Sequence, residues 1–258
     1  MELAKLNVFV SIGILRSYVD RLDFKSYRAA HKPRLTARHR KSRLRWAKEH
    51  LNWTEDQWRS VVSSDESRFC TKGSKRGKRV LREEGERYDE RNIISTVKWG
   101  GGGATVWGCF WGGGFGPLEI IDTTSVDQEI YINILANRFR PWFTNVTAHQ
   151  KRDFIFQEDG ASCHIGGCAR WWKETYPIRG FEYWPAQSPD LNPIEHVWNA
   201  LERQIERKRS SVKDLEHLKV ALREEWERMD DEFADRLVRS MKKQYETITK
   251  AKSGATEC

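Results

Sequence analysis

The chain has 258 residues, of which 38% are hydrophobic and 32% are charged, and its formal net charge is +8 at pH 7. This length is enough to bury a sizeable core, and the basic balance favours a polyanionic partner such as nucleic acid. The sequence has no apolar run of the roughly 18 residues that a membrane helix needs, and its five cysteines lack a CxxC pair, which favours a reduced compartment over a disulfide framework.

The segment 25–50 is strongly basic. Between Lys32 and Lys48 it carries eight Lys or Arg side chains and no Asp or Glu. Such density favours an arm that follows a phosphate backbone and positions DNA without reading its sequence, and a solvated surface is the alternative. From Thr36 to His50 the run is also compatible with a helix. The side chains predicted to contact DNA are Lys32, Arg34, Arg38, Arg40, Lys41, Arg43 and Arg45.

An aspartate, Asp65, follows the short run 58–64, which reads as a strand. A carboxylate at a strand end can serve as a metal ligand, whereas the neighbouring serines also allow a capping or turn role. The next segment, 71–82, is a basic loop with glycines that either contacts DNA or is solvated. Because Arg79 follows Lys78 where a Walker A loop needs Ser or Thr, no nucleotide cofactor is expected.

Residues 93–121 read as strands separated by glycine clusters. The candidate strands are 93–97, 104–110 and 118–121, and the glycines predict tight hairpin connections between them. This spacing is typical of an antiparallel meander. The following segment, 126–143, has the apolar periodicity of a helix.

A second aspartate, Asp159, follows the apolar run 154–158, which is typical of a strand near the centre of a sheet. Asp159 with Gly160 would suit a hairpin turn, but the next residues, 161–172, read as a helix. A carboxylate where a central strand meets a helix lies at the sheet edge where open α/β proteins often carry out chemistry. His164 either flanks this site or has a structural role.

The third carboxylate lies at the start of an amphipathic helix that follows a last predicted strand, 181–184. Asn192 is predicted as the N-cap, Pro193 as the first helical residue and Glu195 as the third. Glu195 is either a capping-box partner of Asn192 or a metal ligand, whereas Asp190 is expected to fix the preceding turn. The helix has an apolar stripe at three- and four-residue steps, formed by Ile194, Val197, Trp198, Leu201 and Ile205.

Asp65, Asp159 and Glu195 are distant along the chain, yet together they form a plausible cage for divalent metal. Hard cations such as Mg²⁺ prefer carboxylate oxygens and keep several waters for a phosphate-bearing substrate. Two such ions a few ångströms apart can activate a nucleophile and stabilise the leaving oxygen of a phosphodiester. The three carboxylates therefore indicate metal-dependent phosphoryl transfer.

Three blocks of the sequence resemble the catalytic region of Tc1/mariner transposases, which belong to the DDE superfamily. The blocks are 64–69 (SDESRF), 157–161 (QEDGA) with His164, and 184–198 (WPAQSPDLNPIEHVW). A weaker resemblance extends from about Lys25 to the C-terminus. Residues 1–24 correspond to the end of the family's second helix-turn-helix but match it poorly, which predicts an N-terminally truncated copy.

The resemblance implies an α/β protein with an RNase H-like fold, in which helices flank a mixed central sheet. The implied domains are 1–50, a basic helical arm left from a helix-turn-helix region and linker; 51–210, the catalytic domain; and 211–258, helices that pack on it. Ser211 with Asp214 is expected to open the first of these last helices, and Asp230 the second. The resemblance assigns the catalytic and metal-binding triad to Asp65, Asp159 and Glu195, which would hold two Mg²⁺ or Mn²⁺ ions.

The function implied by the resemblance is that of a DNA transposase catalytic domain. Water would cleave the DNA at the element ends, and the freed 3′-hydroxyl would then attack target DNA. The expected partner is double-stranded DNA, the expected assembly is a homodimer, and the expected location is the nucleus, after synthesis in the cytoplasm. The alternatives are a catalytically inactive or domesticated DNA-binding remnant of a transposase, and a different RNase H-like nuclease that cleaves RNA–DNA hybrids.

Overall fold

The computed structural model describes residues 35–71, 102–123 and 125–250, together with a few isolated positions between 11 and 21. The chain divides into two compact units, Met1–Arg34 and Leu35–Cys258, and the second contains the sheet and the helices around it. Among the described residues, no helix is long and apolar enough to cross a membrane. The predicted strand 93–97 and, apart from Thr71, the basic loop 71–82 lie outside the described residues.

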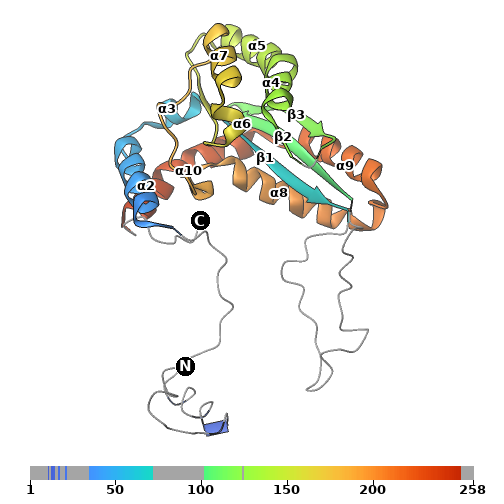
Figure 1. Cartoon of the computed structure of the whole chain (residues 1–258). Helices are drawn as coiled ribbons and strands as arrows, with labels where there is room; N and C mark the ends of the chain where they lie inside the picture. Colours follow the sequence, from blue (N-terminus) through green and yellow to red (C-terminus); the bar gives the residue numbers. More distant parts are fainter. Residues whose placement is uncertain are drawn as a thin grey trace. The chain divides into compact units, whose positions relative to one another are not determined.

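A four-stranded mixed sheet forms the centre of the second unit (Figure 1). The strands are β1 (Val61–Cys70), β2 (Gly103–Trp111), β3 (Gly114–Ile121) and β4 (Ile155–Gln157). Their order in the sheet is β3-β2-β1-β4, with β1 antiparallel to β2 and parallel to β4. The predicted mixed sheet is therefore confirmed.

The first strand differs from its prediction. The segment predicted as a strand from residue 58 instead begins with the end of a short helix, α3 (Glu55–Arg59), and β1 then continues through Asp65. The reason is long-range pairing, because β1 forms a continuous register with β2 from Ser63 to Cys70. Asp65 consequently lies within a strand, and neither the strand end nor the turn predicted for it is present.

The predicted glycine hairpin is confirmed. Strands β2 and β3 pair in antiparallel fashion and are joined at Gly112 and Gly113, between the two strands predicted at 104–110 and 118–121. The second strand begins earlier than predicted because Gly114 and Phe115 also pair with β2. Among the described strands, β3 lies at one edge of the sheet and β4 at the other. The central position predicted for the strand before Asp159 is therefore wrong, since beyond β4 there is just the isolated bridge between Phe156 and Gly180 in the described residues.

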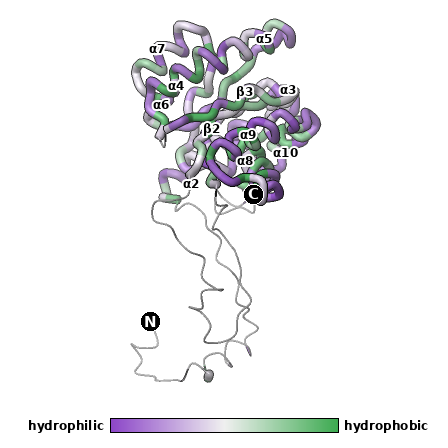
Figure 2. Tube along the Cα trace, turned by 90° about the vertical axis from the view of Figure 1, so that its right-hand side faces the viewer, coloured by the Kyte–Doolittle hydropathy of each residue, from purple (hydrophilic) through white to green (hydrophobic). Residues whose placement is uncertain are grey.

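Helices cover both faces of this sheet (Figures 1 and 2). On one face lie α8 (Ile194–Arg207), α9 (Leu215–Glu227) and α10 (Asp231–Lys250), with α2 (Ala37–His50) packed against α10. On the other face lie α4 (Gln128–Ile134), a π-helical turn η4 (Leu135–Phe139), α5 (Arg140–Gln150), α6 (Ser162–Ile165) and α7 (Gly167–Thr175). The helix predicted at 126–143 is thus confirmed and continues to residue 150.

The sheet separates two hydrophobic cores because successive strand residues point to opposite faces. Val61 and Val106 enter the core under α8, α9 and α10, whereas Val62 and Trp107 enter the core under α4 and α7. Figure 2 shows the strands between these two layers of helices. The first core also contains the whole predicted stripe of α8, namely Ile194, Val197, Trp198, Leu201 and Ile205.

The last two helices begin close to where they were predicted to begin. Asp230 precedes α10 as expected, whereas Ser211 lies in a 3₁₀ turn, η6 (Arg209–Ser211), and Asp214 alone opens α9. Asp214 accepts a hydrogen bond from the backbone N–H of His217 at 2.9 Å and so caps α9. Asp230 accepts one from the N–H of Glu232 at 2.9 Å, directly before α10. Their apolar stripes are buried in the first core, with Leu218, Leu222, Trp226, Leu237, Met241 and Tyr245 all buried.

The segment 181–184, predicted as a strand, is irregular. In the described part of the chain, the pairing next to it is an isolated bridge between Phe156 and Gly180. Its aromatic side chains instead pack edge-on against Trp46 of α2, with ring centroids separated by 4.7 Å for Phe181, 5.3 Å for Tyr183 and 5.1 Å for Trp184. The β-propensity of these aromatic residues therefore serves contact with a helix rather than pairing in the sheet.

Candidate active site

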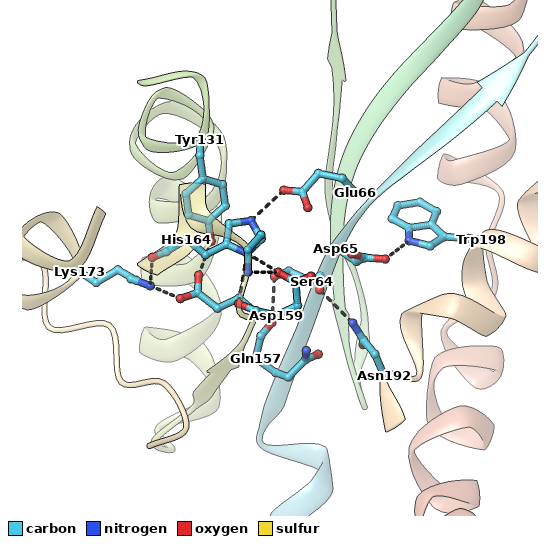
Figure 3. Close-up of polar contacts among 12 residues, drawn as sticks. Ser64, Asp65, Glu66, Tyr131, Gln157, Asp159, His164, Lys173, Asn192 and Trp198 are labelled. Carbon is cyan, nitrogen blue, oxygen red and sulfur yellow. Dashed lines mark hydrogen bonds and ion pairs between the residues drawn. The ribbon is translucent and has the colours of Figure 1, made fainter. Parts of the chain in front are cut away.

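Asp65 lies in the middle of β1, and its carboxylate extends toward α8. It accepts a hydrogen bond from the indole Nε1 of Trp198 at 3.2 Å (Figure 3). Gly108 lies opposite Asp65 in β2, and a Cβ at this position would come within 2.8 Å of the Trp198 ring. The absence of a side chain at residue 108 therefore gives the indole the room it needs to reach the carboxylate.

The start of α8 is fixed to the strand that carries Asp65. Asn192 is buried, and its side-chain amide donates to the carbonyl of Ser64, the residue before Asp65, at 3.2 Å. Ser64 in turn donates through its hydroxyl to the carbonyl of Gln157 at 2.9 Å. These two bonds connect α8, β1 and β4, which are the three elements that carry or precede the predicted triad.

Glu195 lies in the first turn of α8 and is partly buried. The helix begins at Ile194, one residue later than predicted, so that Pro193 occupies the N-cap position. The capping-box interpretation is wrong, because the backbone N–H of Asn192 donates to the carbonyl of Pro189 at 3.0 Å. Burial raises the pKa of Glu195, as expected for a carboxylate that has lost water without gaining a cation.

Asp159 lies two residues beyond the end of β4, and its side chain is 48% exposed. No hairpin turn forms there, because α6 follows directly. Its Oδ1 accepts a hydrogen bond from the N–H of Ala161 at 2.8 Å and lies 2.8 Å from Nδ1 of His164. The hydrogen bond from His164 is the main reason that the pKa of Asp159 is lowered, and it outweighs the opposing effect of burial.

The predicted triad is coupled electrostatically. The pKa of Asp65 is raised to about 8, first by burial and then by the negative charges of Glu195, Glu66 and Asp159. Among the described residues, no cation is one of the main causes of this shift. The site is therefore a region of concentrated, partly desolvated negative charge.

The three carboxylates are near one another but do not form a closed cage. In the part of the chain that the structure describes, no three His, Cys, Asp or Glu side chains are placed so that they could hold a metal ion as they stand. The carboxylate of Asp65 instead accepts a hydrogen bond from Trp198, and that of Asp159 contacts the imidazole of His164 (Figure 3). The oxygen-only donor set fits a hard divalent cation, whereas the arrangement requires these side chains to turn before they share one.

A second polar network lies on the opposite face of β1. Glu66 follows Asp65, so its side chain points away from α8 and meets Nε2 of His164 at 3.2 Å. Burial alone would lower the pKa of His164, but hydrogen bonds to Asp159 and Glu66 outweigh it and raise the pKa to about 11. Glu66 was not predicted as a site residue. The alternation of a strand running through Asp65 was the signal that could have placed it.

The predicted DNA contacts of the basic segment separate into three groups. Arg38, Arg40, Lys41 and Arg45 are exposed on α2, whereas Lys32 and Arg34 lie outside the described residues. Arg43 is 2% exposed, and its guanidinium forms a bidentate ion pair with Asp190, with both N···O distances 2.6 Å. The prediction that Arg43 contacts DNA is wrong in this conformation, because its charge is buried against Asp190 and the carbonyl of Gln187.

The architecture is similar to that of solved Mos1 transposase structures. The catalytic domain of Mos1 mariner transposase superposes on 88% of this chain and 100% of its own, with a TM-score of 0.67 and 19% identity. A pre-cleavage Mos1 transpososome covers 96% of this chain and 72% of its own, with a TM-score of 0.77 and 19% identity. At this identity the likeness shows the fold, and it confirms the RNase H-like prediction.

Two family models match the sequence. One, described as a DDE superfamily endonuclease, matches residues 124–219 and includes Asp159 and Glu195. The other, a transposase helix-turn-helix model, matches residues 1–52. The expectation that residues 1–24 match such a unit poorly is therefore corrected. The fold and these matches define a transposase of the DDE superfamily.

Curated relatives narrow this class to one family. The Tcb1 transposase of Caenorhabditis briggsae is 36% identical over 230 residues, which cover 89% of this chain and 82% of the relative. The Tc1 transposase of Caenorhabditis elegans is 35% identical over 226 residues, which cover 88% and 80%. The chain belongs to the Tc1/mariner family of transposases.

Proposed function

We propose that the chain is a catalytically active DNA transposase in which Asp65, Asp159 and Glu195 hold divalent cations for DNA cleavage and strand transfer. The observation that carries the proposal is the placement of Asp65 on β1, Glu195 in the first turn of α8 and Asp159 just after β4, where the charges of Glu195 and Asp159 both act on the buried Asp65 carboxylate. A carboxylate buried among like charges needs a nearby cation to offset its desolvation and the neighbouring charges if it is to be mostly ionised at neutral pH. A divalent ion between the three carboxylates meets that requirement.

The residues have distinct roles in this proposal. Asp65, on an inner strand of the sheet, would serve both ions, while Asp159 and Glu195 would each serve one. Bound Mg²⁺ or Mn²⁺ supplies a Lewis acid for the phosphate and a water that is readily deprotonated. Solved paired-end complexes of Mos1 with Mn and with Mg support the choice of these metals. In the described conformation Trp198 donates to one oxygen of Asp65 from the α8 side. The carboxylate would turn from this contact when it takes a cation.

The proposed substrate is double-stranded DNA, and α2 contributes to its binding. The exposed Arg38, Arg40, Lys41 and Arg45 would contact phosphates, which position DNA without specifying sequence. Mos1 transposase has been solved as a paired-end complex, which supports a homodimer holding two DNA ends here as well. A nuclear location is part of the same proposal, because the similar Tcb1 and Tc1 transposases come from nematodes, whose chromosomes lie in the nucleus.

Glu195→Gln is expected to abolish metal-dependent nicking without weakening DNA binding. The amide keeps the size of the side chain and its place in the first turn of α8, but it removes the charge that binds a cation. We expect nicking to fall more than about 100-fold, beyond the range typical of residues that only support a metal ligand. Supercoiled-plasmid nicking in Mg²⁺ or Mn²⁺ measures the first effect, and a gel shift in EDTA measures the second.

The matched control is Glu206→Gln, an exposed glutamate near the other end of the same helix. It should leave nicking and DNA binding at the wild-type level. Equal loss of both activities in Glu195→Gln would argue that this residue supports the fold rather than the chemistry. DNA binding by a wild-type protein that fails to nick in either metal would favour the alternative, an inactive DNA-binding remnant.

A further inference from the structure

His164 is buried beside the triad and is held on every side. Its side chain is 3% exposed, and it lies on α6 between β1 and the helices of the second core (Figure 3). Its ring packs against that of Tyr131 with centroids 4.2 Å apart. Its backbone carbonyl accepts a hydrogen bond from Nζ of Lys173 at 3.1 Å, and Lys173 also pairs with Glu158. The imidazole therefore has little freedom to rotate.

One ring nitrogen of His164 fixes the orientation of Asp159. Nδ1 lies 2.8 Å from Oδ1 of Asp159 and 3.3 Å from the backbone carbonyl of the same residue. The N–H of Ala161 also bonds to Oδ1, at 2.8 Å. Both donors use the same oxygen, and Oδ2 receives no hydrogen bond from the described residues. A carboxylate held in this way has one oxygen committed to the protein and one available as a ligand.

The other ring nitrogen connects His164 to β1. Nε2 lies 3.2 Å from Oε1 of Glu66, the residue that follows Asp65. Because neighbouring residues of a strand point to opposite faces, Glu66 can hold His164 while Asp65 contacts Trp198 on the other side. The chain of contacts Glu66–His164–Asp159 therefore ties the end of β4 to the strand position next to Asp65.

We propose that His164 is a positioning residue for the reaction: through Nδ1 it directs Oδ2 of Asp159 to the cation, and Glu66 fixes the imidazole through Nε2. The inference rests on the proposed function, because it assumes that Asp159 is a metal ligand. Metal ligands are commonly oriented by such outer partners, and losing one typically costs 10–100-fold in metal affinity or activity. His164 itself touches neither the substrate nor the reacting atoms.

Two substitutions of His164 separate positioning from packing. His164→Phe keeps an aromatic ring against Tyr131 but removes both N–H donors. His164→Asn places an amide nitrogen near the position of Nδ1 and so restores one donor to Asp159. We expect Mn²⁺ affinity, measured by electron paramagnetic resonance on the full chain without DNA, to fall about 10–100-fold in the Phe variant and to recover largely in the Asn variant. The kcat for nicking should follow the same order, with the KM for DNA unchanged.

The control is His149→Phe, an exposed histidine of α5 whose ring bonds only to its own helix, at the Asn145 carbonyl. It should bind Mn²⁺ like the wild type. Wild-type Mn²⁺ affinity in His164→Phe, or equal losses in the Phe and Asn variants, would overturn the inference. If His164→Phe does not fold, two variants of Glu66 provide the test. Glu66→Gln keeps an acceptor for Nε2 of His164 and should lose less Mn²⁺ affinity than Glu66→Ala. Equal Mn²⁺ affinities of these two variants would overturn the inference.

The inference and the proposed function fail in different ways. If Asp159→Asn and Asp65→Asn bind Mn²⁺ as tightly as the wild type, the proposed metal site is wrong and the inference fails with it. If those two variants lose Mn²⁺ and His164→Phe does not, the metal site stands and only the positioning role is lost.

Discussion

Asp65→Asn is expected to abolish cleavage and at the same time to stabilise the metal-free protein at neutral pH. The carboxylate is buried among Glu195, Glu66 and Asp159, and these surroundings raise its pKa to about 8. An amide carries no charge, so it avoids this repulsion, and its oxygen can still accept the hydrogen bond from Trp198. Cleavage should fall more than about 100-fold, as expected for loss of a metal ligand rather than of a supporting residue.

The stabilisation should depend on pH in a defined direction. Well below pH 3.8, which is its ordinary pKa, Asp65 is protonated in both the folded and the unfolded chain. As the pH rises toward 8, the unfolded chain releases this proton first, so the folded state loses stability, by at most about 1.4 kcal/mol per pH unit. The free energy of unfolding of Asp65→Asn, relative to the wild type in EDTA, should therefore increase between pH 5 and pH 8.

Denaturant unfolding at these two pH values measures the effect. Added Mn²⁺ should reduce the difference between the variant and the wild type, because it binds the folded wild type and offsets the negative charge. If the difference in free energy of unfolding between Asp65→Asn and the wild type is the same at pH 5 and pH 8, the folded protein does not raise the pKa of Asp65. The argument for a cation at this position would then lose its main support.

Arg43→Ala is expected to destabilise the fold by about 3–5 kcal/mol, because it breaks the buried bidentate ion pair with Asp190. The pair is bidentate, both N···O distances are 2.6 Å, and the guanidinium also donates to the carbonyl of Gln187 at 3.1 Å. These contacts join α2 to the turn that precedes α8, so their loss should loosen both elements. Urea unfolding of the full chain measures the change.

The control for this prediction is Arg38→Ala, which removes an exposed arginine from the same helix. It should change stability by no more than about 0.5 kcal/mol and should weaken DNA binding instead. The paired replacement Arg43→Met with Asp190→Leu should recover much of the lost stability, because it leaves no buried charge unpaired. If Arg43→Ala weakens DNA binding with no loss of stability, the original assignment of Arg43 to the DNA interface would be restored.

Arg43 also illustrates what a sequence pattern does not contain. The basic run 32–48 predicted seven DNA contacts from charge density alone, and α2 does expose four of them. Arg43 is the exception, because it forms an ion pair with Asp190, which lies 147 positions away in the sequence and meets Arg43 only after folding. Local composition cannot distinguish an arginine that faces solvent from one that faces such a partner.

The α8 stripe shows the opposite case. Its three- and four-residue spacing follows from the geometry of a helix, so the buried face of α8 was predictable residue by residue. The hairpin between β2 and β3 was predictable for a similar reason, because glycines mark tight turns locally. The mid-strand position of Asp65 was not, since it depends on pairing with Gly108 in a distant strand.

The site itself was only partly accessible from the sequence. Resemblance to a family selected Asp65, Asp159 and Glu195, and the structure couples them electrostatically. Their joint role as metal ligands stays a prediction. Glu66 and the burial of His164 became visible only with the structure, because they depend on which face of β1 each side chain occupies.

Anomalous diffraction from crystals of the full chain soaked in Mn²⁺ examines the metal site most directly. We expect an anomalous Mn²⁺ peak between the carboxylates of Asp65, Asp159 and Glu195. The Asp65 carboxylate should have turned from its hydrogen bond with Trp198 toward this peak. A strong Mn²⁺ peak bound elsewhere, with these three side chains unmoved and without density between them, would contradict the account.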